Sequence, residues 1–349
     1  MYRDDVGLLG RMVRTRLAGR PLFLSHLVTA RCNGRCAFCL WRFGAEDDER
    51  LAAAELTTGE IDWLYRAAAK AGVCYLALWG GEPLLRADIE EILRSAAAAR
   101  LSVVLMTNGW LLPELWPRLR GLVRTLILSL DDAGDDFDRL RGMPGLFDRL
   151  DRFVVGLRAD PERPRLLVNA VLSRLNPGAL TRVAPIAQRW GAGLYFCPMD
   201  TGQMGADGFD NRLANLALGP EDLREAARRA RELKRRGYPF QATNKFLRLL
   251  ERDPGLHDFT CRFPHAALTV LPDGSFRDCT HRDVPLASVR DLRAAGSSLE
   301  ALFRLPRYAE MLREAANCTA CNNPDVIETS WGWRLCPSML WRSLTLSAR

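Results

Sequence analysis

The chain has 349 residues, of which 48% are hydrophobic and 26% are charged, and its formal net charge is +7. This is the composition of a folded globular protein, and the length predicts two domains or one large barrel with an appendage. No apolar run is long enough to span a bilayer, and the segment up to Pro21 lacks the continuous apolar stretch of a secretory signal. We therefore expect a cytoplasmic protein without a membrane partner.

The positive charge is spread along the chain rather than gathered in one block. Lysine occurs only at positions 70, 234 and 245, and the arginines are interleaved with acidic residues, for example across 221–236. A nucleic-acid interface would instead concentrate basic residues on one face. We expect no nucleic-acid partner, and the weakly basic surface favours an anionic substrate.

Short apolar segments alternate with helical patterns over the first 200 residues, after a helical lead-in over 1–21. The predicted strands span 22–29, 75–79, 103–106, 125–130, 167–172 and 193–197. The predicted helices between them span 61–71, 89–99, 114–122, 137–157 and 180–190. This alternation predicts an α/β protein with a parallel sheet, and six units predict a partial (β/α)6 barrel over 22–200. The working residues of such a barrel lie at the carboxyl ends of its strands.

The pattern changes after the predicted barrel. Residues 201–257 read as a loop and a helical linker, with a charged amphipathic helix over 220–236. From 258 a hairpin is expected, because strand patterns over 265–271 and 275–279 flank a Pro-Asp-Gly turn. A helix is expected over 299–316. Residues 258–349 therefore read as a small C-terminal α+β extension.

Ten cysteines are the most informative feature, since clustered cysteines in a cytoplasmic chain indicate metal or redox chemistry. Cys32, Cys36 and Cys39 directly follow the first predicted strand. Three thiolates in one short loop can bind three irons of a cubane cluster and leave the fourth iron open to a small molecule. A zinc site completed from elsewhere in the chain, or three buried cysteines, are the alternatives.

The spacing C-x3-C-x2-C, with Phe38 just before the third cysteine, resembles the signature of radical S-adenosylmethionine (radical SAM) enzymes. The resemblance implies that Cys32, Cys36 and Cys39 bind a [4Fe-4S] cluster together with SAM, and that Phe38 lies near the adenine. It also implies reductive cleavage of SAM to a 5′-deoxyadenosyl radical, which abstracts hydrogen from a substrate.

Further segments resemble the motifs of this family at successive strand ends. Residues 79–83 read Trp-Gly-Gly-Glu-Pro, 107–109 read Thr-Asn-Gly, and 128–132 contain the family's S-x-D pattern. Glycines suit such a place, because the chain must approach a ligand without side chains between them. The resemblance implies SAM contacts from Gly80, Gly81, Glu82, Pro83, Asn108, Ser129, Asp131, Asn169 and Ser173.

The C-terminal cysteines form a second set, which by geometry alone could hold zinc or an iron–sulfur cluster. The spacing G-x4-C, a gap and then C-x2-C resembles the SPASM/twitch extension of radical SAM enzymes, in its shorter twitch form. The resemblance implies one auxiliary [4Fe-4S] cluster on Cys261, Cys279, Cys318 and Cys321. Cys336 is left over as a fifth ligand, a hydrogen donor or a packed side chain.

Two cysteines stand apart from both sets. Cys74 is expected in the core. Cys197, at the end of the sixth strand, is expected to pack in the core rather than act, but it joins Cys336 as a candidate catalytic hydrogen donor. The other candidate substrate-side groups are Arg141, Asp132 and Asp200.

These features predict a radical SAM oxidoreductase or epimerase. Its expected substrate is a small polar natural product, such as an aminocyclitol or a sugar, which it dehydrogenates or epimerises. The alternative is a maturase that crosslinks or oxidises a ribosomally made peptide; only about 20 residues precede the first strand, too few for a leader-binding domain. An iron–sulfur or zinc scaffold without activity is a third reading. The enzyme readings require an electron donor such as flavodoxin or ferredoxin.

Overall fold

The computed structural model describes residues 5–39, 52–199, 215–255, 259–277, 279, 285–318, 321 and 323–333. Six strands, each paired in parallel with the next, form the centre of the protein. They are β1 (Phe23–Thr29), β2 (Tyr75–Gly80), β3 (Ser102–Thr107), β4 (Thr125–Ser129), β5 (Arg165–Leu172) and β6 (Gly193–Pro198). The predicted α/β fold with a partial parallel barrel is confirmed.

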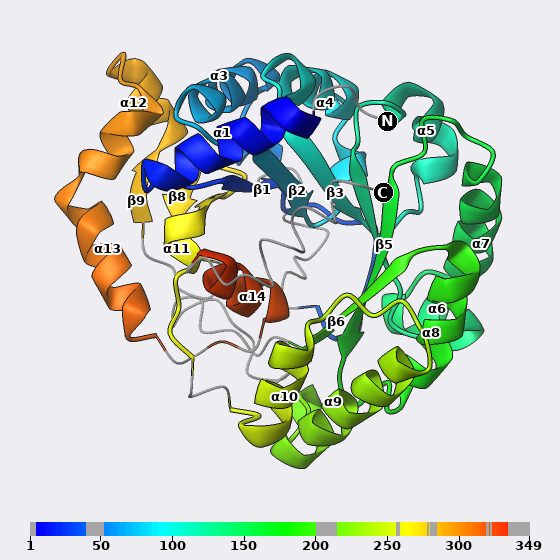
Figure 1. Cartoon of the computed structure of the whole chain (residues 1–349). Helices are drawn as coiled ribbons and strands as arrows, with labels where there is room; N and C mark the ends of the chain where they lie inside the picture. The colour runs from blue at the N-terminus through cyan, green and yellow to red at the C-terminus, as the bar shows by residue number, and fades with distance from the viewer. Residues whose placement is uncertain are drawn as a thin grey trace.

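Helices cover the outer face of this sheet (Figure 1). They are α3 (Thr58–Lys70), α4 (Ile89–Ala98), α5 (Leu112–Leu119), α6 (Gly134–Arg141), α7 (Leu146–Leu157) and α8 (Ala179–Trp190). The core lies between the two layers, because alternate strand residues point to opposite faces. On β2, for example, Leu76 and Leu78 are fully buried, whereas Tyr75 and Ala77 are half-buried on the inner face.

The single helix expected over 137–157 is wrong, because the structure divides it into α6 and α7. Gly142 and Gly145 adopt left-handed φ angles of 60° and 80° on either side of Met143 and Pro144. A left-handed residue ends a helix, and glycine reaches this conformation without steric cost. The break places the carboxyl end of α6 beside the loop that follows β1.

The C-terminal extension continues the same sheet. β7 (Ala267–Val270) pairs in parallel with β1, and β8 (Ser275–Arg277) and β9 (Pro285–Ser288) follow in antiparallel order. The predicted hairpin is thus confirmed as β7 and β8. Among the described residues the sheet runs from β6 at one edge to β9 at the other without closing.

The helices of the extension flank this edge of the sheet, except the last, which packs against other helices rather than strands (Figure 1). They are α11 (Phe263–Ala266), α12 (Val289–Ala294), the 3-10 helix η4 (Leu299–Arg304), α13 (Pro306–Ala316) and α14 (Pro324–Trp333). The expected continuous helix over 299–316 is wrong, because Leu305 is extended and Pro306 starts a new helix. Proline suits the first turn of a helix, where its missing N–H costs nothing.

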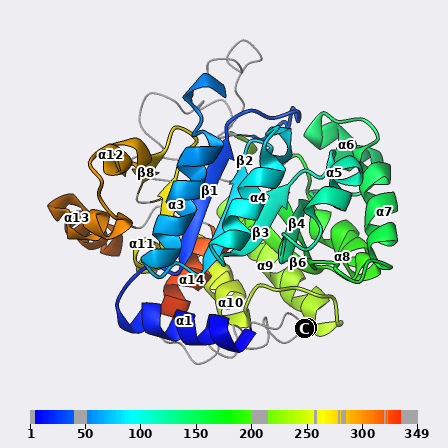
Figure 2. The same cartoon turned by 90° about the horizontal axis from the view of Figure 1, so that it is seen from above.

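Three further helices lie outside these two groups. α9 (Pro220–Arg235) and α10 (Asn244–Arg252) follow the barrel, and α14 contacts α10 and α11. α1 (Asp5–Leu17) lies across the end of the sheet at which the parallel strands begin (Figure 2). In the part of the chain that the structure describes, no helix has the length and apolar character needed to cross a membrane.

Candidate active site at the carboxyl ends of the strands

The loop after β1 gathers the first three cysteines. Cys36 is buried, and Cys32 and Cys39 are half-buried. The N–H of Gly34 donates to Cys32 Sγ over 3.4 Å. A Cβ added at Gly34 would lie 3.6 Å from Cys32 Sγ and 3.5 Å from Cys36 Sγ. A side chain at position 34 would therefore be in van der Waals contact with both sulfur atoms.

The environment of Cys32 favours the protonated thiol. Burial raises the pKa of Cys32 to about 11, and Glu82, Cys36 and Cys39 add to the rise, whereas the Gly34 hydrogen bond opposes it. A metal binds the thiolate and not the thiol, so loading this loop must release protons.

The carboxyl end of α6 holds the cysteine loop. The backbone N–H groups of Arg35 and Ala37 donate to the carbonyl oxygens of Arg141 and Leu140, both over 2.9 Å. The guanidinium Nη1 of Arg141 lies 3.7 Å from Cys36 Sγ, and its Nε donates to Asp131 over 2.5 Å. Burial lowers the pKa of Arg141, but Asp131 and Cys36 outweigh it and raise the pKa, so the side chain keeps its charge.

The end of β2 packs directly on the chain that leads to Cys32. Gly81 N–H donates to Thr29 O and Glu82 N–H donates to Arg31 O, each over 2.8 Å. A Cβ at Gly80 or Gly81 would overlap the carbonyl oxygen of Thr29 or Arg31. These glycines are needed where two segments of backbone touch, whereas the sequence suggested an approach to a ligand.

Glu82 joins the ends of β2 and β3. It is 1% exposed, and its carboxylate accepts from Thr107 Oγ1 over 2.7 Å, from Asn108 N over 2.8 Å and from Leu84 N over 3.0 Å. Burial raises the pKa of this carboxyl, and the three donors oppose the rise. Pro83 begins the short 3-10 helix η2 (Pro83–Leu85) that follows.

The side chain of Asn108 reaches the cysteine loop. Its Nδ2 donates to Asn33 Oδ1 over 2.8 Å. Asn33 lies between Cys32 and Gly34, so the end of β3 fixes a second point of the loop besides those bound by α6. The sequence did not single out Asn33, because no spacing rule links it to a residue 75 positions away.

Ser129 and Asn169 lie opposite each other in the register of β4 and β5. Both are half-buried between neighbours that are fully buried, so they lie on the inner face of the sheet. Cys197 likewise alternates with the fully buried Phe196 on β6, which places its thiol on the inner face and not in the outer core.

Asp131 and Ser173 are engaged within the protein. Asp131 is fully buried and also accepts from Val171 N over 2.8 Å. Ser173 is 1% exposed and bonds to Asn176, whose Nδ2 donates to Asp131 O over 2.8 Å. These side chains shape the ends of β4 and β5, and Asn176 is a linking residue that the sequence did not indicate.

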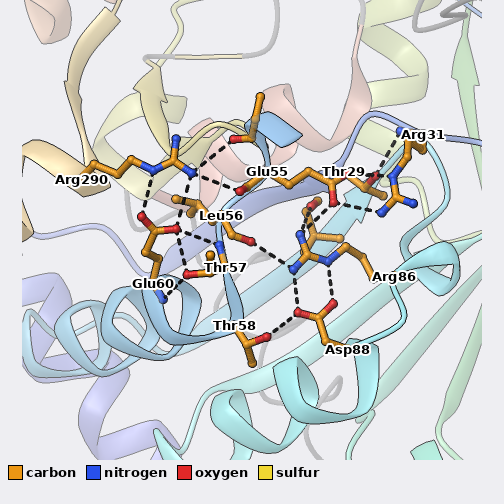
Figure 3. A network of polar contacts seen from close by, with 12 residues as sticks. Thr29, Arg31, Glu55, Leu56, Thr57, Thr58, Glu60, Arg86, Asp88 and Arg290 are labelled. Carbon is orange, nitrogen blue, oxygen red and sulfur yellow. Dashed lines mark hydrogen bonds and ion pairs between the residues drawn. The ribbon is translucent and has the colours of Figure 1, made fainter. Parts of the chain in front are cut away.

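A polar network holds Arg31, the residue before Cys32 (Figure 3). The carboxylate of Glu55 accepts from Thr29 Oγ1, from Arg31 Nη2 over 3.0 Å and from Arg86 Nη1 over 3.0 Å. Arg86 is 6% exposed and also pairs with Asp88 over 2.7 Å. Arg31 directly precedes Cys32, so a buried ion network fixes the start of the loop.

The same network reaches the C-terminal extension. Arg290 of α12 donates to Glu55 O over 3.1 Å and to Glu60 Oε1 over 2.9 Å. Glu60 is part of the capping box of α3, with Thr57 as the N-cap. The extension is thereby tied to the barrel on the side of the cysteine loop (Figure 3).

The C-terminal cysteines come from separate elements. Cys261 precedes α11, Cys279 follows β8, Cys318 follows α13 and Cys321 precedes α14. α11 contacts both α13 and α14, and Arg262 N–H donates to Ser330 Oγ on α14 over 2.9 Å. Three of the four thus lie at the ends of helices that touch each other.

The remaining candidates have other partners or lie elsewhere. Asp132 forms a two-point ion pair with Arg182, over 2.5 and 2.6 Å. Cys74 is buried and its Sγ lies 3.4 Å from Gly72 O, as a core residue should. Asp200 and Cys336 lie outside the described residues.

The donor set of the first loop fits an iron–sulfur cubane. Within the described ranges no three His, Cys, Asp or Glu side chains converge closely enough to hold one metal ion. The three thiolates of a cubane bind three different irons, and they do not converge on one point. Three sulfurs in one loop match this arrangement, whereas a tetrahedral zinc site needs four ligands.

Residues 27–174 match the model of the radical SAM superfamily. The chain is 37% identical over 182 residues to the AdoMet-dependent heme synthase of Methanosarcina barkeri, covering 51% of this chain but only 50% of that protein. It is 28% identical to a probable GTP 3′,8-cyclase of Thermococcus kodakarensis, covering 85% of this chain and 97% of that protein.

Among solved structures, Streptococcus suis SuiB bound to S-adenosylmethionine superposes with a TM-score of 0.66 at 15% identity, covering 92% of this chain and 79% of SuiB. The same protein is solved with its precursor peptide SuiA. At this identity the likeness establishes the fold, which is that of the partial barrel with its extension.

Proposed function

Since the chain carries a radical SAM domain over residues 27–174, we propose that it cleaves S-adenosylmethionine reductively and uses the resulting 5′-deoxyadenosyl radical to abstract hydrogen from a substrate. The observation that carries this proposal is the loop of Cys32, Cys36 and Cys39. It lies at the carboxyl ends of the strands, where Asn108 and the end of α6 hold it through hydrogen bonds. When bound there, a [4Fe-4S] cluster would supply one electron and an open iron for SAM.

The residues around the loop act by holding it in place. Asn108 anchors Asn33, the end of α6 anchors Arg35 and Ala37, and Glu55 anchors Arg31. A reactive radical must meet its target before water or protein does, which requires a rigid and enclosed arrangement. These contacts, made by Asn108, the end of α6 and Glu55, support such rigidity.

The SAM contacts divide into two groups. Ser129 and Asn169 present their side chains on the inner face, and we assign them polar contacts to the ribose. Phe38, 6% exposed beside Cys36, is assigned to the adenine. The second group makes backbone contacts to SAM or shapes its pocket, because its polar side chains bond within the protein. It consists of Gly80, Gly81, Glu82, Pro83, Asn108, Asp131 and Ser173.

For the second cysteine set we propose an auxiliary [4Fe-4S] cluster on Cys261, Cys279, Cys318 and Cys321. Cys261 and Cys279 are buried, and Cys318 and Cys321 pack against the main core. Zinc is the alternative, since it also binds four thiolates. The iron content of a Cys318→Ala variant separates these two ligand assignments.

Two substrate classes follow from the chain. A small polar natural product, dehydrogenated or epimerised, is supported by Cys197, whose thiol lies on the inner face at the end of β6. In epimerisation the radical would remove a hydrogen atom from carbon, and the thiol would return one to the opposite face. The resulting thiyl radical must then gain an electron and a proton, which a ferredoxin or flavodoxin with solvent would supply.

A ribosomally made peptide is the second class, and the comparison with SuiB favours it. SuiB shares the fold over 92% of this chain and is solved with a precursor peptide. A peptide crosslink or oxidation would use the same radical, with the auxiliary cluster as the acceptor of the second electron.

One experiment distinguishes the two classes. The reconstituted protein, with SAM and dithionite in D2O, is offered either aminocyclitols and sugars or synthetic precursor-like peptides, and 5′-deoxyadenosine is measured. The class that raises deoxyadenosine above the substrate-free rate is the substrate class. If Cys197 returns hydrogen, Cys197→Ser will keep deoxyadenosine formation but lose deuterium in the product. Equal deuterium in both proteins would exclude that role for Cys197.

A further inference from the structure

Arg141 contacts the cysteine loop through its side chain and its backbone. Its Nη1 lies 3.7 Å from Cys36 Sγ, and its carbonyl oxygen accepts from Arg35 N–H over 2.9 Å. The contact joins residues 105 positions apart. From this geometry we propose that Arg141 is a positioning residue that sets the reduction potential of the N-terminal cluster through a charged hydrogen bond to the Cys36 sulfur. The inference rests on the proposed function, because it requires a cluster on Cys32, Cys36 and Cys39.

The guanidinium is fixed by its other partners. Asp131 accepts from its Nε over 2.5 Å and is itself held by Val171 N–H over 2.8 Å. The rings of Phe38 and Phe137 lie 5.5 and 5.9 Å from its Cζ. The Arg141 side chain is 11% exposed and Asp131 is fully buried. An arginine confined in this way holds one orientation toward the sulfur.

Gly142 makes the approach possible. It ends α6 in a left-handed conformation, and a Cβ there would lie 2.9 Å from Arg35 Cβ and 3.0 Å from Arg35 O. The helix end can therefore pack against the cysteine loop only because residue 142 has no side chain. The break between α6 and α7 thus places Arg141 next to the Cys36 sulfur.

The charges around Arg141 determine the direction of its effect. Reduction adds negative charge to a cluster and its thiolates, so a nearby cation favours the reduced state, and hydrogen bonds to the sulfurs act in the same sense. Asp131 acts in the opposite sense. Asp132, the next residue, forms an ion pair with Arg182, and this arginine neutralises the charge of Asp132. Burial strengthens these effects, because little water screens them.

The test is a redox titration of the reconstituted full chain, followed by electron paramagnetic resonance. The N-terminal cluster is identified by the signal that changes when SAM is added. Arg141→Gln should lower the ratio of reduced to oxidised cluster about tenfold at a fixed potential, which is about 59 mV for one electron. Arg141→Lys should lower the ratio of reduced to oxidised cluster less, and Asp131→Asn should raise this ratio. Arg139→Gln is the matched control, because Arg139 lies on the same helix with a 75% exposed side chain paired to Asp136.

An unchanged potential in Arg141→Gln with full iron content would overturn the inference, as would an equal shift in Arg139→Gln. If Arg141→Gln does not retain iron, the reduction potentials of Arg141→Lys and Asp131→Asn test the inference instead. Shifts of opposite sign in these two support the inference, and shifts of the same sign overturn it. A wild-type protein without any SAM-responsive cluster would instead refute the proposed function.

Discussion

The two cysteine groups of this protein are built in different ways. Cys32, Cys36 and Cys39 come from a single loop, and the ends of β2 and β3 and of α6 hold that loop from several sides. The four C-terminal cysteines come from the ends of four separate elements, α11, β8, α13 and α14. The first group needs a scaffold only to fix a loop, whereas the second requires the packing of an entire extension.

This difference determines how each group can be disturbed. The N-terminal loop depends on close backbone contacts and a buried ion network, so single substitutions at its supports should have large effects. The extension is joined to the barrel through β7 and through Arg290 at the surface, where single contacts contribute less.

The ion network at Glu55 should give the largest loss of stability. Glu55→Gln leaves the buried Arg86 with a weakened partner, and breaking a buried ion pair costs about 4 kcal/mol. Arg290→Gln removes an ion pair whose arginine side chain is 44% exposed, and it should cost less than about 1 kcal/mol. Urea unfolding of the metal-free chain measures both. Equal losses would show that the two regions are held with similar strength.

The contact between β1 and β2 should be almost as sensitive. Gly81→Ala forces a Cβ into the carbonyl oxygen of Arg31, with an expected cost of about 3 kcal/mol and a loss of iron after reconstitution. Gly156→Ala is the matched control, since a Cβ at that position in α7 meets nothing within 4 Å. It should be neutral or stabilising by about 0.5 kcal/mol. A stable, iron-loaded Gly81→Ala protein would contradict the role assigned to this contact.

The third effect, smaller than those at Glu55 and Gly81, concerns β1, the strand that both regions share. His26 is fully buried, its Nδ1 bonds to Tyr65 Oη over 2.9 Å, and burial, with Arg86, lowers its pKa from 6.5 to about 3. His26 therefore binds a proton more readily in the unfolded chain than in the folded protein. The free energy of unfolding consequently falls as the pH drops from about 6.5 toward 3. Between pH 7 and pH 5 this amounts to about 2 kcal/mol.

A His26→Gln variant isolates this contribution, because glutamine can still bond to Tyr65 but does not titrate. Urea unfolding of the metal-free chain at both pH values should show a drop about 2 kcal/mol smaller in the variant than in the wild type. The same drop in both proteins would assign the acid sensitivity to other groups.

The sequence predicts local features well in this protein. The six parallel strands could be located from apolar runs, with their ends displaced by one or two residues, and the loop of Cys32 could be identified from spacing alone. The prediction of one helix over 137–157 failed at the short Gly-Met-Pro-Gly segment after Arg141. The apolar pattern continues through this segment, but its glycines end the helix. Helix α14 and strand β9 were not predicted, since neither carries a strong periodic signal.

Contacts between distant segments were beyond the reach of spacing arguments. Arg141 was placed among substrate-side groups, yet its side chain reaches Cys36 and Asp131. Asn33, Glu55 and Asn176 were not noticed, because each acts through a partner at least 24 residues away in the chain. Gly81 was singled out as a SAM contact, and the structure adds a separate reason for glycine there, since a Cβ would overlap the carbonyl oxygen of Arg31.

The most direct test of the central claim is a comparison of the wild-type chain with Cys32→Ala/Cys36→Ala/Cys39→Ala after anaerobic reconstitution. Iron, sulfide and 5′-deoxyadenosine formed from SAM with dithionite are measured together. We predict about eight irons and deoxyadenosine in the wild type, and about four irons with no deoxyadenosine in the variant. Deoxyadenosine formation that survives the triple substitution would contradict the assignment of this loop as the site of SAM cleavage.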